Sequence, residues 1–148
     1  MGVLWFGGIA VNESMRPQFK AGKALVKAAD AGDESGVEAL LKQHASTMMR
    51  DSEGHSALWL GANHGHINIV ARLLKSGADP NSIGHEGWTP LMAAAYNGHF
   101  DVVKLLVANK ANPAARDIGN MTAADYAKDY PEIVAYLRAE IAKAAPAR

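Results

Sequence analysis

The chain has 148 residues, a length typical of one domain, and with 49% hydrophobic and 20% charged residues it has the composition of an ordinary globular protein. Fifteen basic and fifteen acidic residues give a formal net charge of zero, so no overall electrostatic attraction to nucleic acid or to an anionic membrane is expected. The absence of cysteine excludes disulfides, thiolate zinc sites and cysteine nucleophiles, and no apolar run reaches the roughly 18 residues that span a bilayer.

The first predicted segment, residues 1–18, is an apolar N-terminal extension whose first eleven residues include three glycines. It is similar to the core of a short signal peptide, but it lacks a positively charged start and a small-residue cleavage site. A segment that packs over the following helices and a disordered tail are the two alternatives to a secretion signal.

The rest of the chain, residues 19–148, repeats itself at an offset of 33 residues. At this offset Gly65 coincides with Gly98 and with Gly32. Further coincidences join Gly54 to Gly87, Leu58 to Leu91, His66 to His99, Val70 to Val103, Leu73 to Leu106 and Ala78 to Ala111. The period divides the chain into four units at about residues 19–50, 51–83, 84–116 and 117–148.

Each central unit is predicted to contain two short helices, and the third unit shows the signals most clearly. Thr89 is a helix N-cap, and Pro90 follows at the first helical position, where its missing N–H costs nothing. The alanine-rich helix over residues 91–96 ends before Gly98, because glycine adopts the left-handed conformation that ends a helix. Residues 100–108 predict a second, apolar helix, and the polar stretches between units predict extended turns.

The outer units are predicted to cap the stack, with helices at residues 25–30 and 35–42 in the first unit. In the last unit the second helix, at residues 132–142, aligns only if its inter-helix turn is two residues shorter, which places Ile133 31 residues after Val102. No helix here is long enough to be stable alone, so the stacking of units has to supply the core.

The third unit resembles the ankyrin repeat. Residues 87–94, Gly-Trp-Thr-Pro-Leu-Met-Ala-Ala, are similar to the signature glycine-x-threonine-proline-leucine-histidine-x-alanine, residues 98–106 to the second helix of that family and residues 77–81 to its closing turn. The resemblance covers about residues 19–138. It implies an all-α repeat solenoid of about four ankyrin helix-turn-helix units joined by β-hairpin-like loops.

Two features depart from the family pattern. Trp59, Met92 and Asp125 replace the histidine of the first helix, so the hydrogen bonds that this histidine makes in the family are absent. Lys110 stands where Gly77 stands one unit earlier, and a left-handed turn there would strain a non-glycine residue by roughly 1 kcal/mol. We therefore expect a soft spot at this turn.

No motif for catalysis or for a cofactor is found. The sequence contains no dinucleotide fingerprint, P-loop or nucleophile elbow, and its carboxylates are spread out with no evident buried pair. The histidines lack the spacing of metal ligands; His66 and His99 are expected to be structural, and His55, His64 and His85 to belong to a binding surface. We expect no enzymatic activity, no cofactor and no metal.

The resemblance implies a binding surface, since hairpin tips and the exposed ends of first helices line the concave face in ankyrin proteins. The 33-residue offset places His55, Trp88 and Met121 in one row across three hairpins, with Tyr96 behind Trp88. Tryptophan and methionine on polar tips are typical of an interaction hot spot, and packing of Trp88 against Trp59 inside the stack is the alternative. The expected binding residues are Ser52, Glu53, His55, Asn63, His64, His85, Glu86, Trp88, Tyr96, Asn97, Arg116, Ile118 and Met121.

These observations predict a monomeric, cytoplasmic adaptor or interaction module whose partner is another protein, not nucleic acid or a membrane; a nuclear location stays open. Two alternatives are a dedicated inhibitor or regulator of one enzyme, such as a kinase, and a secreted bacterial effector, which would need a signal in residues 1–18. Asn81 lies in a turn that resembles the context modified by asparagine hydroxylases in animal ankyrin proteins. The basic residues of the second helices, Lys42, Arg72, Lys75 and Lys104, are interpreted as a solvated face.

Overall fold

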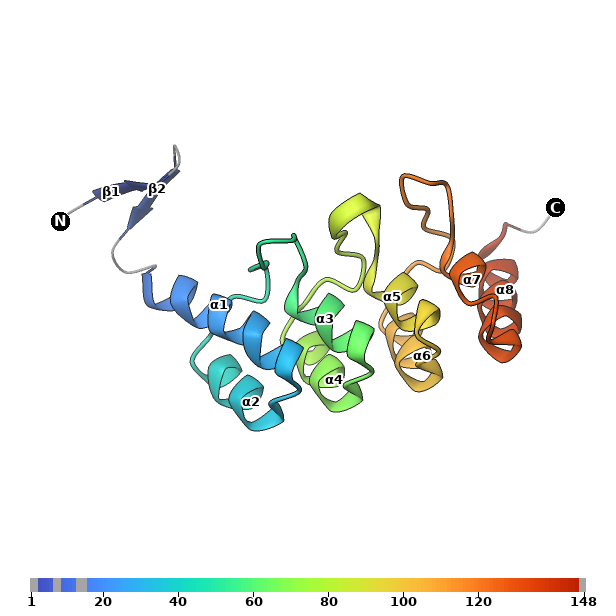
Figure 1. Ribbon diagram of the computed structural model, residues 1–148, viewed down its shortest axis with the longest axis horizontal. Coiled ribbons are helices and arrows are strands. Elements are labelled where there is room, and N and C mark those ends of the chain that lie inside the picture. Colours follow the sequence, from blue (N-terminus) through green and yellow to red (C-terminus); the bar gives the residue numbers. More distant parts are fainter. Residues whose placement is uncertain (1–2, 7–8, 13–15, 147–148) are drawn as a thin grey trace.

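The computed structural model describes residues 3–6, 9–12 and 16–146. Figure 1 shows an elongated stack of helix pairs that follow one another in chain order. The pairs are α1 (Arg16–Ala31) with α2 (Glu34–Lys42), α3 (Ala57–His64) with α4 (Ile67–Lys75), α5 (Pro90–Tyr96) with α6 (Phe100–Ala108), and α7 (Ala123–Tyr126) with α8 (Pro131–Ala144). A 3-10 turn, η2 (His85–Gly87), lies between α4 and α5.

The stack has two helical layers. The first helices α1, α3, α5 and α7 contact one another in succession, and the second helices α2, α4 and α6 do the same beneath them. Each first helix also packs on the second helix of its own pair. One core therefore runs along the stack; its largest fully buried side chains include Leu58, Leu73, Leu91, Leu106 and Leu137. No helix of the described part of the chain is both long and apolar enough to cross a membrane.

The predicted helix at residues 100–108 coincides with α6, and α4 is the equivalent helix of the second unit. The first helix of the stack differs, because α1 begins at Arg16 and not at residue 25. Pro17 lies in its first turn, where proline costs no helical hydrogen bond. The added turns pack through the buried Gly22, since a Cβ atom there would overlap the side chain of Met49.

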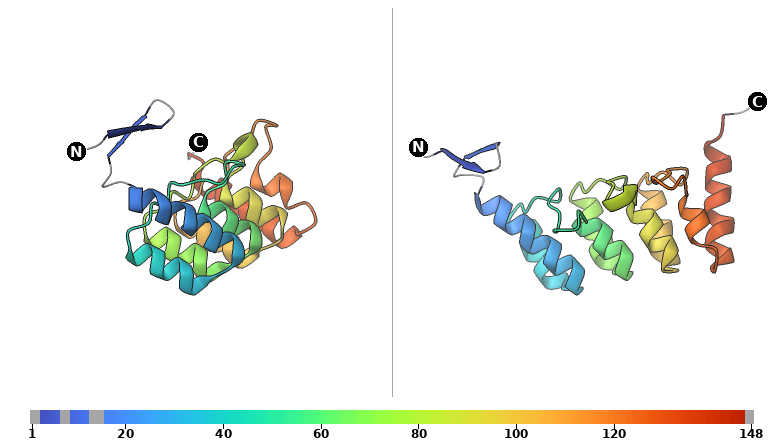
Figure 2. Two further views of the ribbon diagram at one scale, coloured as in Figure 1. Left: turned by 60° about the vertical axis from the view of Figure 1, so that its left-hand side comes forward. Right: turned by 45° about the horizontal axis from the view of Figure 1, so that its top comes forward.

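An antiparallel hairpin precedes the stack. Strand β1 (Val3–Phe6) pairs with strand β2 (Ile9–Asn12), with Val3 opposite Asn12. The hairpin lies beyond the N-terminal end of α1, apart from the other helices (Figures 1 and 2). The sequence analysis did not predict it, although Gly7-Gly8 between two apolar runs is a recognised hairpin signal.

The inter-helix turns explain how successive pairs fit together. In three of them a glycine adopts a left-handed conformation, with φ between 72° and 74°. A Cβ atom on any of these glycines would collide with an aromatic ring of the next pair, so the glycine is required by both backbone and packing. The glycine and ring pairs are Gly32 with His66, Gly65 with His99, and Gly98 with Tyr130. Tyr130 follows His99 by 31 residues, which confirms the predicted shorter turn in the last unit.

The exit turns of the first three pairs are left-handed as well. Gly77 has a φ of 88°, and His44 and Lys110 have φ values of 59° and 71° without being glycine. Asn81 bridges two of these exit segments, because its Nδ2 donates to the carbonyl of Lys110 at 3.0 Å and its Oδ1 accepts from the N–H of Asn112 at 2.7 Å. Lys110 thus keeps the left-handed conformation of Gly77 without being glycine, and the soft spot at this turn stays a prediction.

Candidate protein-binding surface

Three hairpins connect the helix pairs and rise along one side of the stack (Figure 1). We define hairpin 1 as residues 50–56, hairpin 2 as residues 83–89 and hairpin 3 as residues 116–122. Each hairpin is closed by a backbone hydrogen bond at the same position, so residues 33 positions apart are equivalent in the three hairpins. The bonds run from the N–H of Asp51 to the carbonyl of His55 (3.0 Å), from Gly84 to Trp88 (2.8 Å) and from Asp117 to Met121 (3.1 Å). His55, Trp88 and Met121 therefore occupy matching backbone positions.

In hairpin 1 the side chain of His55 is held within the protein. Its backbone N–H donates to Asp51 Oδ1 at 2.8 Å, and its Nδ1 lies 3.1 Å from Asp51 Oδ2. The imidazole stacks on Trp59, with ring centroids 4.0 Å apart and planes 17° apart. Burial alone would raise the pKa of Asp51, but the hydrogen bonds from His55 outweigh it and hold that pKa below 3.8. His55 thus points to Trp59 in its own unit.

A shallow pocket of about 440 Å³ lies between hairpins 1 and 2. The ring of Trp59 stacks on the lining residue His55, and its indole Nε1 is buried without a hydrogen-bond partner among the described residues. On the rim, His85 Nδ1 lies 4.0 Å from Glu86 Oε1, and both side chains are exposed. The lining residues are Ser52, Glu53, His55 and His85, all of which the sequence analysis assigned to the binding surface.

Trp88, Tyr96 and Tyr126 form what we call the aromatic cluster. Ring centroids are 4.4 Å apart for Trp88 and Tyr126, 5.7 Å for Trp88 and Tyr96, and 6.3 Å for Tyr96 and Tyr126. Trp88 and Tyr126 are half-buried, and Tyr96 is 55% exposed. The predicted proximity of Tyr96 to Trp88 is confirmed, and the ring neighbours of Trp88 are these two tyrosines.

The sequence analysis missed Tyr126 as a member of this cluster. The available signal was its size, because the equivalent position in α5 is Ala93 and a large ring stands out in a layer of small residues. The hydroxyl of Tyr126 donates to Asp117 Oδ2, and the N–H of Met121 donates to Asp117 Oδ1 at 2.9 Å. These hydrogen bonds, led by that of Tyr126, hold the pKa of Asp117 below 3.8, and Asp117 raises the pKa of Tyr126 above 10.0.

Hairpin 3 presents two exposed apolar side chains. Ile118 is 79% exposed and Met121 39% exposed. The N–H of Ile118 donates to the carbonyl of Glu86 at 3.1 Å, which joins hairpins 2 and 3. The guanidinium of Arg116 is turned back to the carbonyl of Asn120, at 2.7 Å. Ile118 and Met121 are thus exposed on the hairpin whose Asp117 accepts the hydrogen bond of Tyr126 in the aromatic cluster.

Two of the predicted surface residues, Asn63 and Asn97, are hydrogen-bonded to each other. Asn97 Nδ2 donates to Asn63 Oδ1 at 3.0 Å, and the carbonyl of Asn63 lies 3.1 Å from His99 Nε2. Both asparagines are half-buried and use these polar atoms between α3 and α5, and their role in binding stays a prediction. His64 stays exposed and lies 3.0 Å from Asp30 Oδ1.

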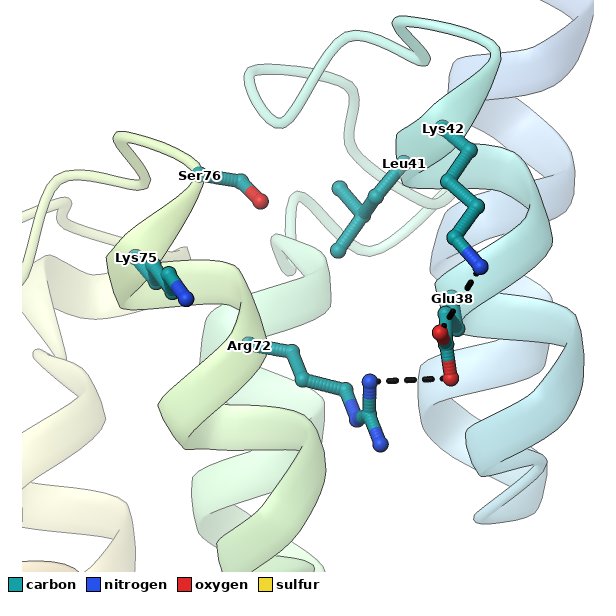
Figure 3. Close-up of a pocket in the computed structure, with 6 residues that line it drawn as sticks. All are labelled: Glu38, Leu41, Lys42, Arg72, Lys75 and Ser76. Atoms are coloured by element: carbon teal, nitrogen blue, oxygen red, sulfur yellow. Dashed lines mark ion pairs between the residues drawn. The ribbon is translucent and has the colours of Figure 1, made fainter.

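The basic residues of the second helices lie on the other side of the stack. Figure 3 shows a pocket of about 270 Å³ between α2 and α4, in which Glu38 pairs with both Lys42 and Arg72 at 2.9 Å. Lys42 and Lys75 occupy the last turns of their helices, where the helix dipole favours cations. This arrangement supports the interpretation of a solvated face. Across the described residues, no three histidine, aspartate or glutamate side chains converge as a metal site.

The repeat character of the chain is also found by comparison with known families. The family model described as ankyrin repeats (many copies) matches the chain over residues 58–107 and again over residues 93–138. Together the two matches run from α3 into α8 and cover more than half of the chain. A comparison with curated proteins finds no match.

Proposed function

This chain belongs to the ankyrin-repeat family, whose repeats are in general protein–protein interaction modules, and on that premise we propose that it is an adaptor that binds another protein through hairpins 2 and 3 and the aromatic cluster. A cytoplasmic location and a monomeric state are part of the same proposal. The surface combines Trp88 and the two tyrosines with the exposed Ile118 and Met121.

The observation that carries the proposal is the exposure of the aromatic cluster beside hairpin 3. Large apolar side chains that gather on a surface mark interaction sites, and aromatic residues dominate the energetics of such sites. Here Tyr96, Ile118 and Met121 are exposed together, while Trp88 is packed firmly enough to act as an anchor.

The rigidity of the hairpins also supports a binding role. Hairpin 3 is tied to α7 through Asp117 and Tyr126, and to hairpin 2 through Ile118 and Glu86. A surface that is already ordered loses little conformational entropy when it docks, so more of the interaction energy appears as affinity.

Affinity capture with paired variants tests this proposal. The double variant Tyr96→Ala, Ile118→Ala removes two exposed apolar side chains of the surface, and Ile67→Ala removes an exposed one at the start of α4. We expect proteins captured by the wild type to be lost by the double variant and retained by Ile67→Ala, and the affinity for the purified partner to fall by about tenfold or more. Thermal unfolding must first show that all three proteins are folded.

Equal recovery of every partner by the wild type and the double variant would contradict the proposed surface. The purified partner then separates an adaptor from an inhibitor or regulator. An inhibitor changes the catalytic rate of its partner when it is added alone, whereas an adaptor needs a third component. Light scattering of the free protein checks the monomeric state.

A further inference from the structure

The aromatic cluster has unpaired negative charge beside it. Asp117 accepts hydrogen bonds from Tyr126 and Met121, and Glu86 is close enough to Tyr126 for its charge to contribute to the raised pKa of that phenol. Glu86 is exposed, and its Oε1 lies 4.0 Å from His85 Nδ1. Among the described residues, neither carboxylate forms an ion pair with a lysine or an arginine.

The arginines of the hairpins do not compensate for these carboxylates. The guanidinium of Arg116 is bound to the carbonyl of Asn120 at 2.7 Å, and that of Arg50 to the carbonyl of Gly54 at 2.7 Å. No cation of the described chain lies over Trp88, Tyr96 or Tyr126. The net charge of zero thus conceals an aromatic surface whose neighbouring carboxylates, Asp117 and Glu86, form no ion pair with a lysine or arginine of the described residues.

The second-helix layer shows the same combination of groups with a cation in place. Phe100 packs edge-on against Tyr136, with centroids 5.5 Å apart and planes at 70°. Lys104 Nζ lies 4.7 Å from the centroid of Phe100 and 3.1 Å from Asp101 Oδ1. The ring of Phe100 and the carboxylate of Asp101 therefore hold an ammonium group of this chain, and the aromatic cluster offers rings and carboxylates without a cation over them.

We infer that the aromatic cluster, together with Glu86, receives a basic side chain of the partner protein, arginine in particular. The face of an aromatic ring attracts a cation, and a carboxylate at its edge strengthens that attraction. Arginine fits better than lysine, because its planar guanidinium stacks on a ring while its N–H groups reach a carboxylate. This inference rests on the proposed function and names the chemistry of the partner at the same surface.

Titration of the ¹⁵N-labelled full chain with short peptides tests the inference. The probe is acetyl-Gly-Arg-Gly-amide, its neutral counterpart carries citrulline in place of arginine, and the readout is the indole N–H signal of Trp88. We expect a saturating shift in the millimolar range, with the citrulline peptide binding about threefold or more weakly. Glu86→Gln should weaken the arginine peptide to a similar extent, while the matched variant Glu132→Gln, on the exposed start of α8, should leave it unchanged.

Three results would overturn the inference: no saturating shift at Trp88, equal binding of the citrulline peptide, or unchanged binding by a folded Glu86→Gln variant. None of them touches the proposed function if Tyr96→Ala, Ile118→Ala still loses its partner. Conversely, retention of the partner by that double variant would overturn the proposed function whatever the peptides do.

Discussion

The ring of Tyr130 lies against Gly98 in the place that His99 takes against Gly65, although Tyr130 belongs to a turn two residues shorter. Two different aromatic rings thus complete the same junction. Each junction consists of a left-handed glycine of one helix pair and an aromatic ring of the next. Substitution of the glycine therefore measures how much the junction contributes to stability.

We expect Gly98→Ala to destabilise the protein more than Gly77→Ala. Both glycines are left-handed, with φ values of 74° and 88°, so each alanine carries a strain of about 1 kcal/mol. A Cβ at residue 77 meets nothing within 4 Å, whereas a Cβ at residue 98 would force Tyr130 to move, which adds about 1–3 kcal/mol. Urea unfolding followed by circular dichroism gives both values, and an equal loss would show that Tyr130 yields freely.

Replacing Lys110 by glycine should stabilise the protein. Lys110 has a φ of 71°, a conformation that glycine adopts without the steric cost paid by other residues. We expect the free energy of unfolding to rise by about 0.5–1 kcal/mol. Lys110→Ala is the control, because it removes the charge and keeps the strain; a gain in that variant equal to the gain with glycine would assign the effect to charge.

Asn81→Ala should lower the free energy of unfolding by about 1–3 kcal/mol, because it breaks two hydrogen bonds between successive exit segments. The exposed Asn68, whose Nδ2 donates to Glu34 Oε1 at 2.9 Å, provides the comparison, and its replacement by alanine should cost less than about 0.5 kcal/mol. Chemical denaturation measures both. Equal losses of stability in the two variants would show that the hydrogen bonds of Asn81 stabilise the fold no more than that of Asn68.

The stabilisation provided by Asp117 should depend on pH. Its pKa is lowered below 3.8 in the folded protein, chiefly by the Tyr126 hydroxyl, so folding favours the charged form. This stabilisation is present above about pH 4 and is lost as the pH falls through the folded pKa. The melting temperature of the wild type should therefore exceed that of Asp117→Asn at pH 7, and the difference should shrink below about pH 4.

Glu132→Gln controls for the loss of one negative charge in that experiment. A difference between the wild type and Asp117→Asn that stays constant from pH 7 to pH 3 would mean that the charge of Asp117 is not what holds hairpin 3 to α7.

Much of the fold could be predicted from the sequence because every unit packs its two helices in the same way. The 33-residue period aligns Lys110 with Gly77, and both residues are left-handed in the structure. The shorter last turn follows from the match of Ile133 to Val102. The equivalence of His55, Trp88 and Met121 was predicted for the same reason, since the backbone hydrogen bonds that close each hairpin recur with the repeat.

The period cannot say where a side chain turns once the backbone is placed. His55 and Trp88 are equivalent in the repeat, yet His55 stacks on Trp59 of its own unit, whereas Trp88 packs at a tilt against Tyr126 of the next. The two rings make different contacts because the residues that surround them differ between units. For the same reason Asn63 and Asn97 were assigned to the surface before the structure placed them in contact with each other.

The sequence by itself determined the repeat, its helices and its turns, because these depend on local backbone preferences and on a pattern of apolar residues that recurs every 33 positions. Only the tertiary structure decided that Trp88, Tyr96 and Tyr126 meet, since their contact depends on how far one helix pair is rotated and shifted against the next. That relation between units is set by packing across the whole junction, which no single stretch of residues encodes.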